Sequence, residues 1–359
     1  MWIGFCLREL LFGASNSAWE FNGLKFFNRG MHGMSPARIT RKERPARGHV
    51  HSRTTKKNLL TLFDYSPEEI EQLLSLARKL KAHRPFADPK SFAEKTGVLI
   101  FEKPSLRTRI TFETAINELG GHAIYLASDQ VQMGKRETVR DVAKNLDRWV
   151  HLIVARTFFH DTVVQLATHS SIPVVNALSD KFHPCQALAF GLTVQERLGT
   201  RADVNIVFVG DGNNVCNSIM VMAAKLGWRF TAAGPRGYKP DPVVVGMCRD
   251  IARSTGAKID IADNVAAAVR DASVIYTDVW TSMGQEKEAA MRKRRFAPFQ
   301  VNEKLLAKAP RGVLVSHCLP AHRGEEITSG VLDSDNSIAL DEAENRLHVQ
   351  KAVIVHLFS

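Results

Sequence analysis

Short apolar runs alternate with amphipathic stretches along this chain from residue 58 onward. In the first half, runs of strand length are separated by patterns that have the apolar spacing of a helix. The strand-like runs are 98–101, 123–126, 152–155 and 174–176, and the helical patterns are 67–80, 111–119, 138–149 and 162–169. This alternation predicts a parallel sheet covered by helices.

A second series of the same kind follows a long helical pattern at 183–198. Its apolar runs are 204–209, 230–233, 258–261, 274–277 and 313–316, with helices predicted between them and a last helical pattern at 344–352. The chain is therefore predicted to be an α/β protein with two doubly wound parallel-sheet domains, at 58–198 and 199–339.

The first 57 residues lack such a pattern and carry most of the net charge. Eleven Lys or Arg against three Glu give this leader a charge of +8, out of +11 for the whole chain. Its basic residues lie among Gly, Ser, His and Pro, a composition that predicts disorder. Two origins fit it: an organellar transit peptide, or a translation start assigned too far upstream, with Met31 or Met34 as the initiator. We favour the second.

Composition narrows the class of protein. The 359 residues are 45% hydrophobic and 24% charged, which is typical of a globular chain long enough for two cores. Because no run of eighteen apolar residues occurs, we expect no membrane association. The five cysteines lack paired CxxC spacing, so we expect a reduced, cytoplasmic setting, or an organellar matrix if the leader is a transit peptide. The nearly balanced charge after residue 57 argues against a nucleic-acid partner.

The residues that follow the strand-like runs of the first domain are suited to binding an anion. In open parallel sheets, ligands bind beyond the carboxyl ends of the strands. Ser105, Arg107 and Thr108 follow the run 98–101 and precede a helix, where free N–H groups favour phosphate; an ordinary helix cap is the alternative. Arg156 follows 152–155. His183 and Gln186 open the next helix, and Arg156 and His183 are suited to polarising a carbonyl oxygen.

The second domain offers groups suited to an amino acid. Gly210 and Gly212 resemble a dinucleotide turn, but the third glycine is replaced by Val215, so we expect no nicotinamide cofactor. Asn213 and Asn214 carry amides that suit a carboxylate or an amino group. Asp278 and Ser282 are suited to holding an ammonium group, with an Asp that caps a loop as the alternative. The run 292–295, Arg-Lys-Arg-Arg, is interpreted as a solvated helix face.

Cys318 follows the last strand-like run, next to His317, where a thiol can become accessible and polarised. His317, Cys318 and His322 resemble zinc ligands, but no fourth ligand occurs at metal spacing. We therefore expect no metal and no cofactor.

Five motifs together resemble one family. In order they are S-L-R-T-R, H-P-C-Q, D-G-N-N, D-x-W-x-S-M-G and H-C-L-P-A-H-R-G-E-E. They resemble the aspartate/ornithine carbamoyltransferases from about residue 58 to the C-terminus, and the last two resemble the branch that uses ornithine. The resemblance implies a carbamoyl-phosphate domain completed by residues 340–359, an ornithine domain, and a homotrimer with active sites between subunits.

The resemblance also implies roles for individual residues. Carbamoyl phosphate would be held by Ser105, Leu106, Arg107, Thr108, Arg156, His183 and Gln186, with Gln132 reaching in from a neighbouring subunit and Cys318, Leu319 and Arg346 completing the site. Ornithine would be held by Asn214, Asp278, Ser282 and Met283. The family pattern often has Thr at the position of Leu106. We expect that position to contribute its backbone N–H, so that the change is harmless.

The implied reaction has no covalent enzyme intermediate. The neutral δ-amine of ornithine would attack the carbonyl carbon, with Arg156, His183 and Thr108 stabilising the oxyanion and Cys318 orienting the amine, to give citrulline and phosphate. The alternatives are a sister enzyme that acts on N-acetylornithine, putrescine or aspartate, and a basic RNA-binding protein that uses the leader and the run 292–295. The sequence leaves open whether the reaction serves arginine biosynthesis or citrulline breakdown.

Overall fold

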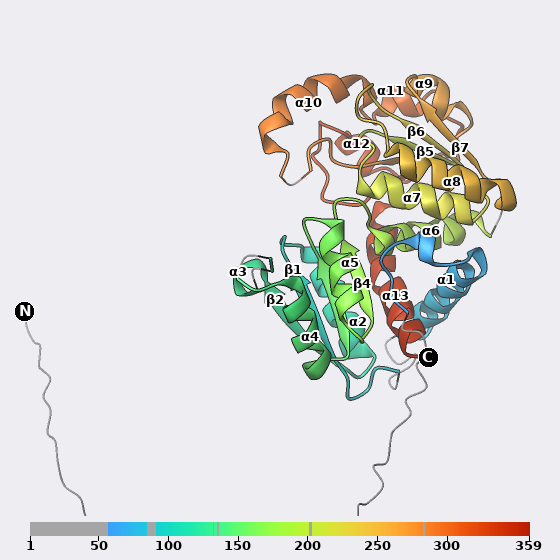
Figure 1. The fold of residues 1–359 in the computed structure, drawn as a ribbon. Coiled ribbons are helices and arrows are strands. Elements are labelled where there is room, and N and C mark those ends of the chain that lie inside the picture. Colours follow the sequence, from blue (N-terminus) through green and yellow to red (C-terminus); the bar gives the residue numbers. More distant parts are fainter. Residues whose placement is uncertain (1–56, 85–90, 132, 135, 201–202, 283) are drawn as a thin grey trace, which may run out of the picture. The chain divides into compact units, whose positions relative to one another are not determined.

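The structure is a computed structural model that describes residues 57–84, 91–131, 133–134, 136–200, 203–282 and 284–359. The described residues belong to one compact unit. They form two lobes, each built on a parallel sheet with helices on both faces (Figure 1). The predicted fold class is therefore confirmed. Among the described helices, none is both long and apolar enough to cross a bilayer.

The first lobe contains a four-stranded parallel sheet in the order β2-β1-β3-β4. The strands are β1 (Thr96–Phe101), β2 (His122–Ala127), β3 (Leu152–Arg156) and β4 (Val174–Leu178). The helices are α1 (Pro67–Ala82), α2 (Leu106–Glu118), α3 (Ser128–Val131), α4 (Val139–Trp149), α5 (His160–His169) and α6 (Pro184–Leu198), preceded by the 3-10 helix η1 (Leu62–Asp64).

Alternation along the strands places apolar side chains on both faces of this sheet. In β1, Leu99 and Phe101 pack in the core that includes residues of α1, α2 and α6. Val98 and Ile100 pack instead in a core with residues of α4 and α5. A sheet buried on both faces explains why its strands appear in the sequence as continuous apolar runs.

The second lobe contains a five-stranded parallel sheet in the order β7-β6-β5-β8-β9. The strands are β5 (Asn205–Val209), β6 (Arg229–Ala233), β7 (Lys258–Ala262), β8 (Val274–Thr277) and β9 (Leu314–His317). The helices are α7 (Asn214–Lys225), α8 (Pro242–Thr255), α9 (Val265–Ala268), α10 (Ala289–Phe296), α11 (Glu303–Leu306) and α12 (Ser329–Leu332), with the 3-10 helices η2 (Val269–Asp271), η3 (Glu286–Glu288) and η4 (Ala297–Phe299).

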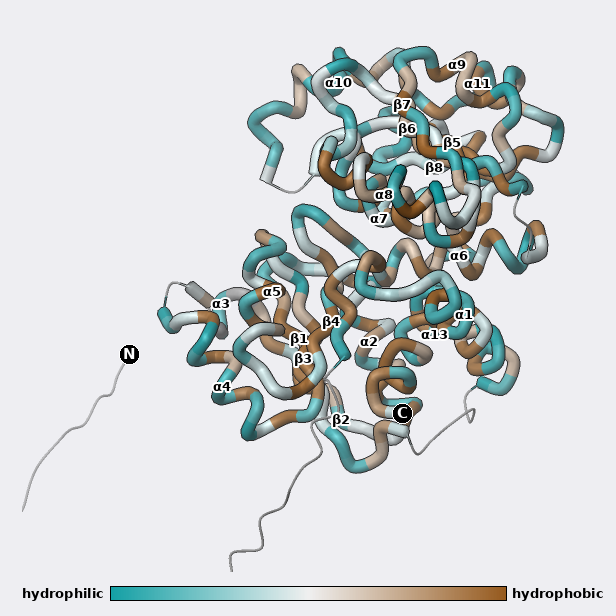
Figure 2. Tube along the Cα trace, turned by 45° about the vertical axis from the view of Figure 1, so that its right-hand side comes forward, coloured by the Kyte–Doolittle hydropathy of each residue, from teal (hydrophilic) through white to brown (hydrophobic). Residues whose placement is uncertain are grey.

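The last helix, α13 (Ala339–Phe358), returns to the first lobe (Figure 1). It follows β9 and α12 in the sequence, yet it packs against α1, α2 and α6. Its residues Leu347, Val353 and Ile354 belong to the same buried core as residues of both sheets. Colouring by residue hydropathy shows the first sheet as mostly hydrophobic, as expected for buried strands, and α10 as mostly hydrophilic (Figure 2). A continuous apolar core therefore joins the two lobes.

Local sequence signals account for several helix starts. Ser66 caps α1, with its hydroxyl accepting from the N–H of Glu69 and the carboxylate of Glu69 accepting from the N–H of Ser66, and Pro67 is the first helical residue.

Two helices differ in extent from the prediction. The helix α2 begins at Leu106 instead of 111, and α13 has 20 residues where a helix was predicted only at 344–352.

Candidate active site

A cleft of about 1340 Å³ lies at the carboxyl ends of the strands of both sheets. Most of the residues predicted from the sequence line it. They are Ser105, Leu106, Arg107, Thr108, Arg156, His183, Gln186, Asn214, Asp278, Ser282, Cys318, Leu319 and Arg346. The other two, Gln132 and Met283, lie outside the described residues. Residues separated by up to 240 positions are thus brought into one cavity.

The N-terminus of α2 forms one wall of the cleft. Ser105 is the N-cap, and its hydroxyl accepts from the N–H of Thr108 at 3.3 Å. That bond satisfies one of the free N–H groups of the first turn, so the N–H groups of Leu106 and Arg107 remain available to a ligand. The guanidinium of Arg107 has no hydrogen-bond or ion-pair partner among the residues that the structure describes. Both observations favour an anion at this wall.

The second guanidinium of the S-L-R-T-R motif does not belong to the cleft. Arg109 donates to Glu113 at 2.9 Å, and its guanidinium lies 3.7 Å from the centre of the Tyr125 ring. Arg109 is also exposed to solvent. The cradle suggested by the motif therefore contains Arg107 and not Arg109.

Arg346 of α13 closes this side of the cleft. It donates to the hydroxyl of Thr108 at 3.1 Å and to the amide oxygen of Gln186. Burial lowers the pKa of Arg346. The helix that comes last in the sequence thus supplies a cation to the site formed by the first sheet.

Arg156 and His183 contribute buried donors at the floor of the cleft. Arg156 Nε and His183 Nδ1 are buried without a hydrogen-bond partner in the part of the chain described. Burial, with the nearby Arg346 cation, lowers the pKa of Arg156 to about 10, which leaves it charged at neutral pH. Burial and the same cations keep the pKa of His183 well below its ordinary value, so its imidazole is neutral. Unpaired buried donors are costly, which is typical of groups kept for a ligand.

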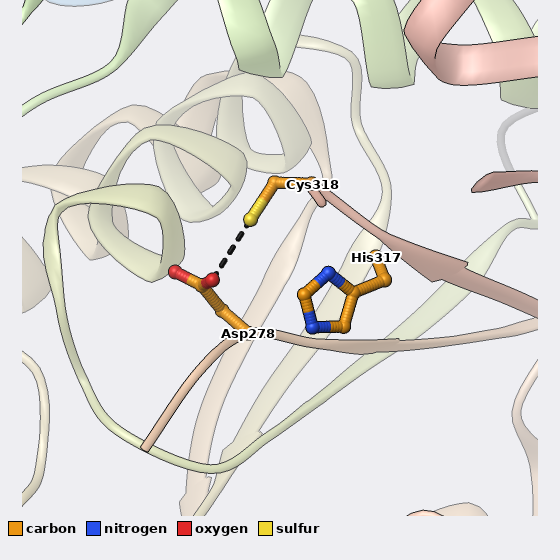
Figure 3. A group of neighbouring side chains, drawn as sticks. All are labelled: Asp278, His317 and Cys318. Carbon is orange, nitrogen blue, oxygen red and sulfur yellow. Dashed lines mark hydrogen bonds between the residues drawn. The ribbon is translucent and has the colours of Figure 1, made fainter. Parts of the chain in front are cut away.

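On the other side of the cleft, the Asp278 carboxylate follows β8 and is held by three donors. Asn213 Nδ2 donates to it at 2.7 Å, the N–H of Val279 at 2.8 Å, and Cys318 Sγ at 2.8 Å. Figure 3 shows the Cys318 thiol directed at this carboxylate. Burial, together with Asp278, raises the pKa of Cys318 well above its usual range, so the sulfur stays protonated. A protonated thiol orients its neighbours but is a poor nucleophile.

His317 lies beside this pair, yet its ring is engaged elsewhere (Figure 3). Its Nδ1 accepts from the N–H of Leu319 at 2.8 Å, and its Nε2 lies 3.0 Å from Glu326. These partners assign the proton to Nε2. Although Asp278, His317 and Cys318 lie close enough to surround an ion, both ring nitrogens are already used. His317 instead fixes the backbone that carries Cys318 and Leu319.

Comparison with known proteins identifies the family of this chain. Residues 57–196 match the family model described as "Aspartate/ornithine carbamoyltransferase, carbamoyl-P binding domain", and residues 202–357 match "Aspartate/ornithine carbamoyltransferase, Asp/Orn binding domain". The chain belongs to the aspartate/ornithine carbamoyltransferase family.

Several relatives in this family are similar over most of their length. The ornithine carbamoyltransferase of Pyrococcus horikoshii is 49% identical over 302 residues, which is 84% of this chain and 95% of the relative. The structure of ornithine carbamoyltransferase from Pyrococcus furiosus has a TM-score of 0.80 at 47% identity and covers 83% of this chain and 96% of its own. An N-acetyl-L-ornithine transcarbamylase has a TM-score of 0.77 at 30% identity, over 84% and 99% of the two chains.

This carbamoyltransferase fold also buries a residue that the sequence analysis assigned to solvent. Arg292 opens the basic run 292–295, yet only 3% of it is exposed. It forms an ion pair with Asp211, donates to the carbonyl oxygen of Trp280 at 2.6 Å, and lies 4.8 Å from the centre of the Tyr238 ring. The interpretation of the run as a solvated face is therefore wrong for Arg292, although the next three residues are exposed. Neither Asp211 nor Arg292 was predicted as a residue lining the cleft.

The two asparagines of the D-G-N-N motif have different tasks in this family member. Asn213 caps α7 by accepting from the N–H groups of Val215 and Cys216, at 3.0 and 3.1 Å, while its NH2 group orients Asp278. Asn214 donates to the carbonyl oxygen of Ser179 at 2.6 Å. Their NH2 groups are thus used within the protein, and the Asn214 carbonyl oxygen is the group left for a ligand.

The glycines of the same motif serve packing. Gly210 has a φ of +134°, which a residue with a side chain rarely adopts. A Cβ atom at Gly212 would lie 2.2 Å from the backbone nitrogen of Pro240. The close approach of the 237–240 loop therefore explains a G-x-G pattern that resembles a dinucleotide turn.

Proposed function

We propose that this chain transfers the carbamoyl group of carbamoyl phosphate to the δ-amine of L-ornithine, giving L-citrulline and phosphate. One observation carries the proposal: a single cleft joins a set of cations without ion-pair partners to a buried carboxylate. Arg107, Arg156 and Arg346 form no ion pair with described residues, and Asp278 lies across the cleft from them. The names of the relatives agree with this chemistry.

The phosphate of carbamoyl phosphate binds at the start of α2. The free N–H groups of Leu106 and Arg107 and the Arg107 guanidinium hold its oxygens. Ser105, Thr108, Gln186, Leu319 and Arg346 complete the site. Because these groups are fixed before the substrate arrives, little reorganisation is needed when charge moves onto the departing phosphate.

The carbonyl oxygen of the carbamoyl group is bound by Arg156, His183 and Thr108. The ornithine amine attacks the carbonyl carbon, a C–N bond forms, and negative charge develops on this oxygen. Collapse of the tetrahedral intermediate breaks the bond to the phosphate oxygen, and the departing phosphate accepts the proton that the amine loses. Donors aimed at the oxyanion stabilise it more than the ground state, which accelerates the reaction.

Asp278 selects the second substrate by binding the α-ammonium group of ornithine. Asn214, Ser282 and Met283 complete the ornithine site, and the protonated Cys318 orients the δ-amine. The ornithine site belongs to residues 199–339, whereas residues 58–198 together with 340–359 hold carbamoyl phosphate. An anabolic ornithine carbamoyltransferase of Pyrococcus furiosus, 48% identical to this chain, supports a place in arginine biosynthesis.

A citrulline-type assay with three amines tests the proposed substrate. We expect carbamoyl transfer to L-ornithine, and at least a hundredfold lower kcat/KM with N-acetylornithine or putrescine. N-acetylornithine lacks the α-ammonium group that Asp278 pairs with, and an unpaired buried carboxylate is costly. Putrescine keeps that amine but lacks the α-carboxylate, so it forfeits the contacts that the ornithine site makes with this group. Equal use of N-acetylornithine would contradict the assignment of Asp278 and favour the sister enzyme.

Two arginines two residues apart give a matched test of the phosphate site. Arg107→Ala removes an unpaired guanidinium from the cleft, so we expect carbamoyl-phosphate binding to fall at least a hundredfold. Arg109→Ala removes a guanidinium that pairs with Glu113 outside the cleft, so binding should change less than threefold. Calorimetric titration of both variants with inorganic phosphate gives the same comparison without turnover. Near-normal affinity in Arg107→Ala would sink the assignment.

We also propose that the chain works as a homotrimer in a reducing compartment, the cytoplasm if no targeting signal is used. Large apolar side chains are exposed on the first lobe, among them Trp149, Phe158 and Phe159, which supports an interface there. Gln132 from a neighbouring subunit would then complete the site. The four cysteines in the described part of the chain are free thiols, which supports a reducing setting.

A further inference from the structure

The carboxyl group of Glu342, at the start of α13, is buried beneath the cleft. Its residue is 0% exposed, and it does not line the cavity. Three donors reach it: Gln186 Nε2 at 2.5 Å, the hydroxyl of Tyr276 at 2.8 Å, and the hydroxyl of Ser316. Burial raises the pKa of Glu342, while the three donors and the Arg346 cation oppose that rise. Such a group is expensive to bury and calls for an explanation.

Two of the donors come from neighbouring strands. Tyr276 of β8 and Ser316 of β9 are register partners, so their side chains reach the same carboxylate from adjacent positions. Asp278 and Cys318, which are hydrogen-bonded to each other, each follow two residues later. Glu342 therefore touches the strands that carry the amino-acid side of the cleft and, through Gln186, the phosphate side.

The contact with Gln186 determines which way that amide faces. An amide has an NH2 group and a carbonyl oxygen, and a 180° flip exchanges them. Gln186 donates its NH2 group to Glu342, which accepts, and presents its oxygen to Arg346, which can only donate. A flipped Gln186 would set its oxygen against the carboxylate and its NH2 group against the guanidinium. Glu342 and Arg346 together allow one orientation.

Arg346 also connects this network to Thr108, at the wall of the cleft. Arg346 also donates to the hydroxyl oxygen of Thr108 at 3.1 Å. Because that oxygen already accepts, the Thr108 proton is free to donate to a ligand at the start of α2. The chain of bonds links Thr108, Arg346, Gln186 and Glu342: Arg346 donates both to Thr108 and to Gln186, and Gln186 donates to Glu342.

We propose that Glu342 is a positioning residue for carbamoyl-phosphate binding: it fixes the orientation of the Gln186 amide and, through it, the guanidinium of Arg346 and the donor direction of Thr108. This inference rests on the proposed function. It assigns a task to an acidic residue that touches no substrate.

The substitution Glu342→Gln tests the proposal with little change of shape. A glutamine at this position can donate to a flipped Gln186, which leaves Arg346 facing an NH2 group. We expect the KM for carbamoyl phosphate to rise about tenfold or more, the loss of one hydrogen bond to a charged group. The KM for ornithine should change less than threefold, because the Tyr276 and Ser316 hydroxyls can rotate to accept from the new amide.

Tyr276→Phe is the matched control. It removes another hydrogen bond to the same carboxylate but leaves the contact between Glu342 and Gln186 in place. We expect a lower Tm and a KM for carbamoyl phosphate within about twofold of the parent. If both variants raise this KM equally, or if Glu342→Gln leaves it unchanged, the proposal is overturned.

Two further measurements keep the outcome decisive. If Glu342→Gln does not fold, Glu342→Asp withdraws the carboxylate from Gln186 by one methylene, and a KM for carbamoyl phosphate raised at least threefold is expected; a parental KM contradicts the proposal. If the parent forms no citrulline, the proposed function fails, and stabilisation by inorganic phosphate decides the inference separately. Phosphate should raise the Tm of the parent more than that of Glu342→Gln, and equal shifts would refute it.

Discussion

The pair of Asp211 and Arg292 shows how burial and charge compete at single residues. The side chain of Asp211 is 12% exposed and that of Arg292 4%. Burial raises the pKa of Asp211 to about 6, and the adjacent Arg292 cation only partly offsets this rise. The ion pair therefore does not repay the full cost of desolvation. The pair instead holds α10 to the carbonyl oxygen of Trp280, at the edge of the ornithine side.

This raised pKa predicts a pH dependence of stability. Between about pH 4 and pH 6 the folded protein keeps the Asp211 proton that the unfolded chain loses, so stability should fall as the pH rises through this window. A shift from 3.8 to about 6 corresponds to a loss of up to about 3 kcal/mol. Asp211→Asn lacks this titration. From pH 4 to pH 7, the unfolding free energy of the parent, measured by urea denaturation, should therefore fall relative to that of the variant.

The cost of leaving Arg292 without Asp211 is treated as the same at every pH, and so as a constant offset in the variant. A difference that does not change with pH would show that Asp211 titrates near its ordinary value. The slope, and not the absolute stability of the variant, is the quantity to compare.

The sequence identified site residues whose place in the chain, just after a strand, indicates that they lie at the edge of a sheet. Ser105, Asp278 and Cys318 lie within four residues of the ends of strand-like runs, and the structure places all three in the cleft. Asp211 precedes Gly212 at such a position but was not chosen. Glu342 could not be found in this way, because one acidic residue among several in a helix does not reveal that it is buried. Its neighbours come from strands and a helix that are distant in the sequence.

Among the elements, α2 is the helix that we propose holds the phosphate. Leu106 is its first residue, and 75% of Leu106 is exposed. A leucine side chain offers phosphate no hydrogen bond, so the position contributes through its backbone N–H or not at all. This distinction can be tested, because proline fits the first position of a helix but lacks the N–H.

Two substitutions of Leu106 separate the backbone from the side chain. Leu106→Thr restores the residue common in the family pattern and should change the KM for carbamoyl phosphate less than threefold. Leu106→Pro keeps the helix start but removes one donor, and that KM should rise about tenfold. Circular dichroism checks that α2 is intact in both variants. A large gain of affinity in Leu106→Thr would instead show that a hydroxyl at this position binds phosphate.

The strands were easier to predict than the helix boundaries. The central strands are buried on both faces and so are mostly apolar runs, and the predicted runs lie within two residues of the strands found. The first turn of α2 was missed because Arg107 and Arg109 gave it no apolar stripe. The helix α13 was predicted too short at both ends, because it is buried on all sides from Asn345 to Val355 and so lacks a clear amphipathic period.

For the whole molecule, the described residues that line the cleft come from both lobes, and the first of them along the chain is Lys103. The matched family models cover residues 57–196 and 202–357, and the predicted leader at 1–57 falls almost wholly before them. The leader lies outside the described residues apart from Lys57, which pairs with Glu69 of α1.

Deletion of residues 1–56 should leave carbamoyl transfer intact. We expect kcat/KM for both substrates within twofold of the full chain, because the described residues that line the cleft begin at Lys103, and Lys57 is retained. The same deletion tests the alternative of an RNA-binding protein. A protein of that kind would lose its retention on a polyanion column, whereas a carbamoyltransferase would keep forming citrulline. A tenfold loss of activity would assign the leader a direct part in catalysis.

The return of α13 to the first lobe also constrains how the chain folds during synthesis. Domains usually fold in the order in which the ribosome delivers them. Here the first lobe cannot complete its packing early, because the helix that covers α1, α2 and α6 is translated only after the entire second lobe. Until then its apolar face is an exposed surface for chaperones or for aggregation. The half of the protein that is made first is therefore the half that matures last. A premature stop codon before α13 would leave α1, α2 and α6 uncovered and would also remove Glu342, the partner of Tyr276 and Ser316 in the second sheet.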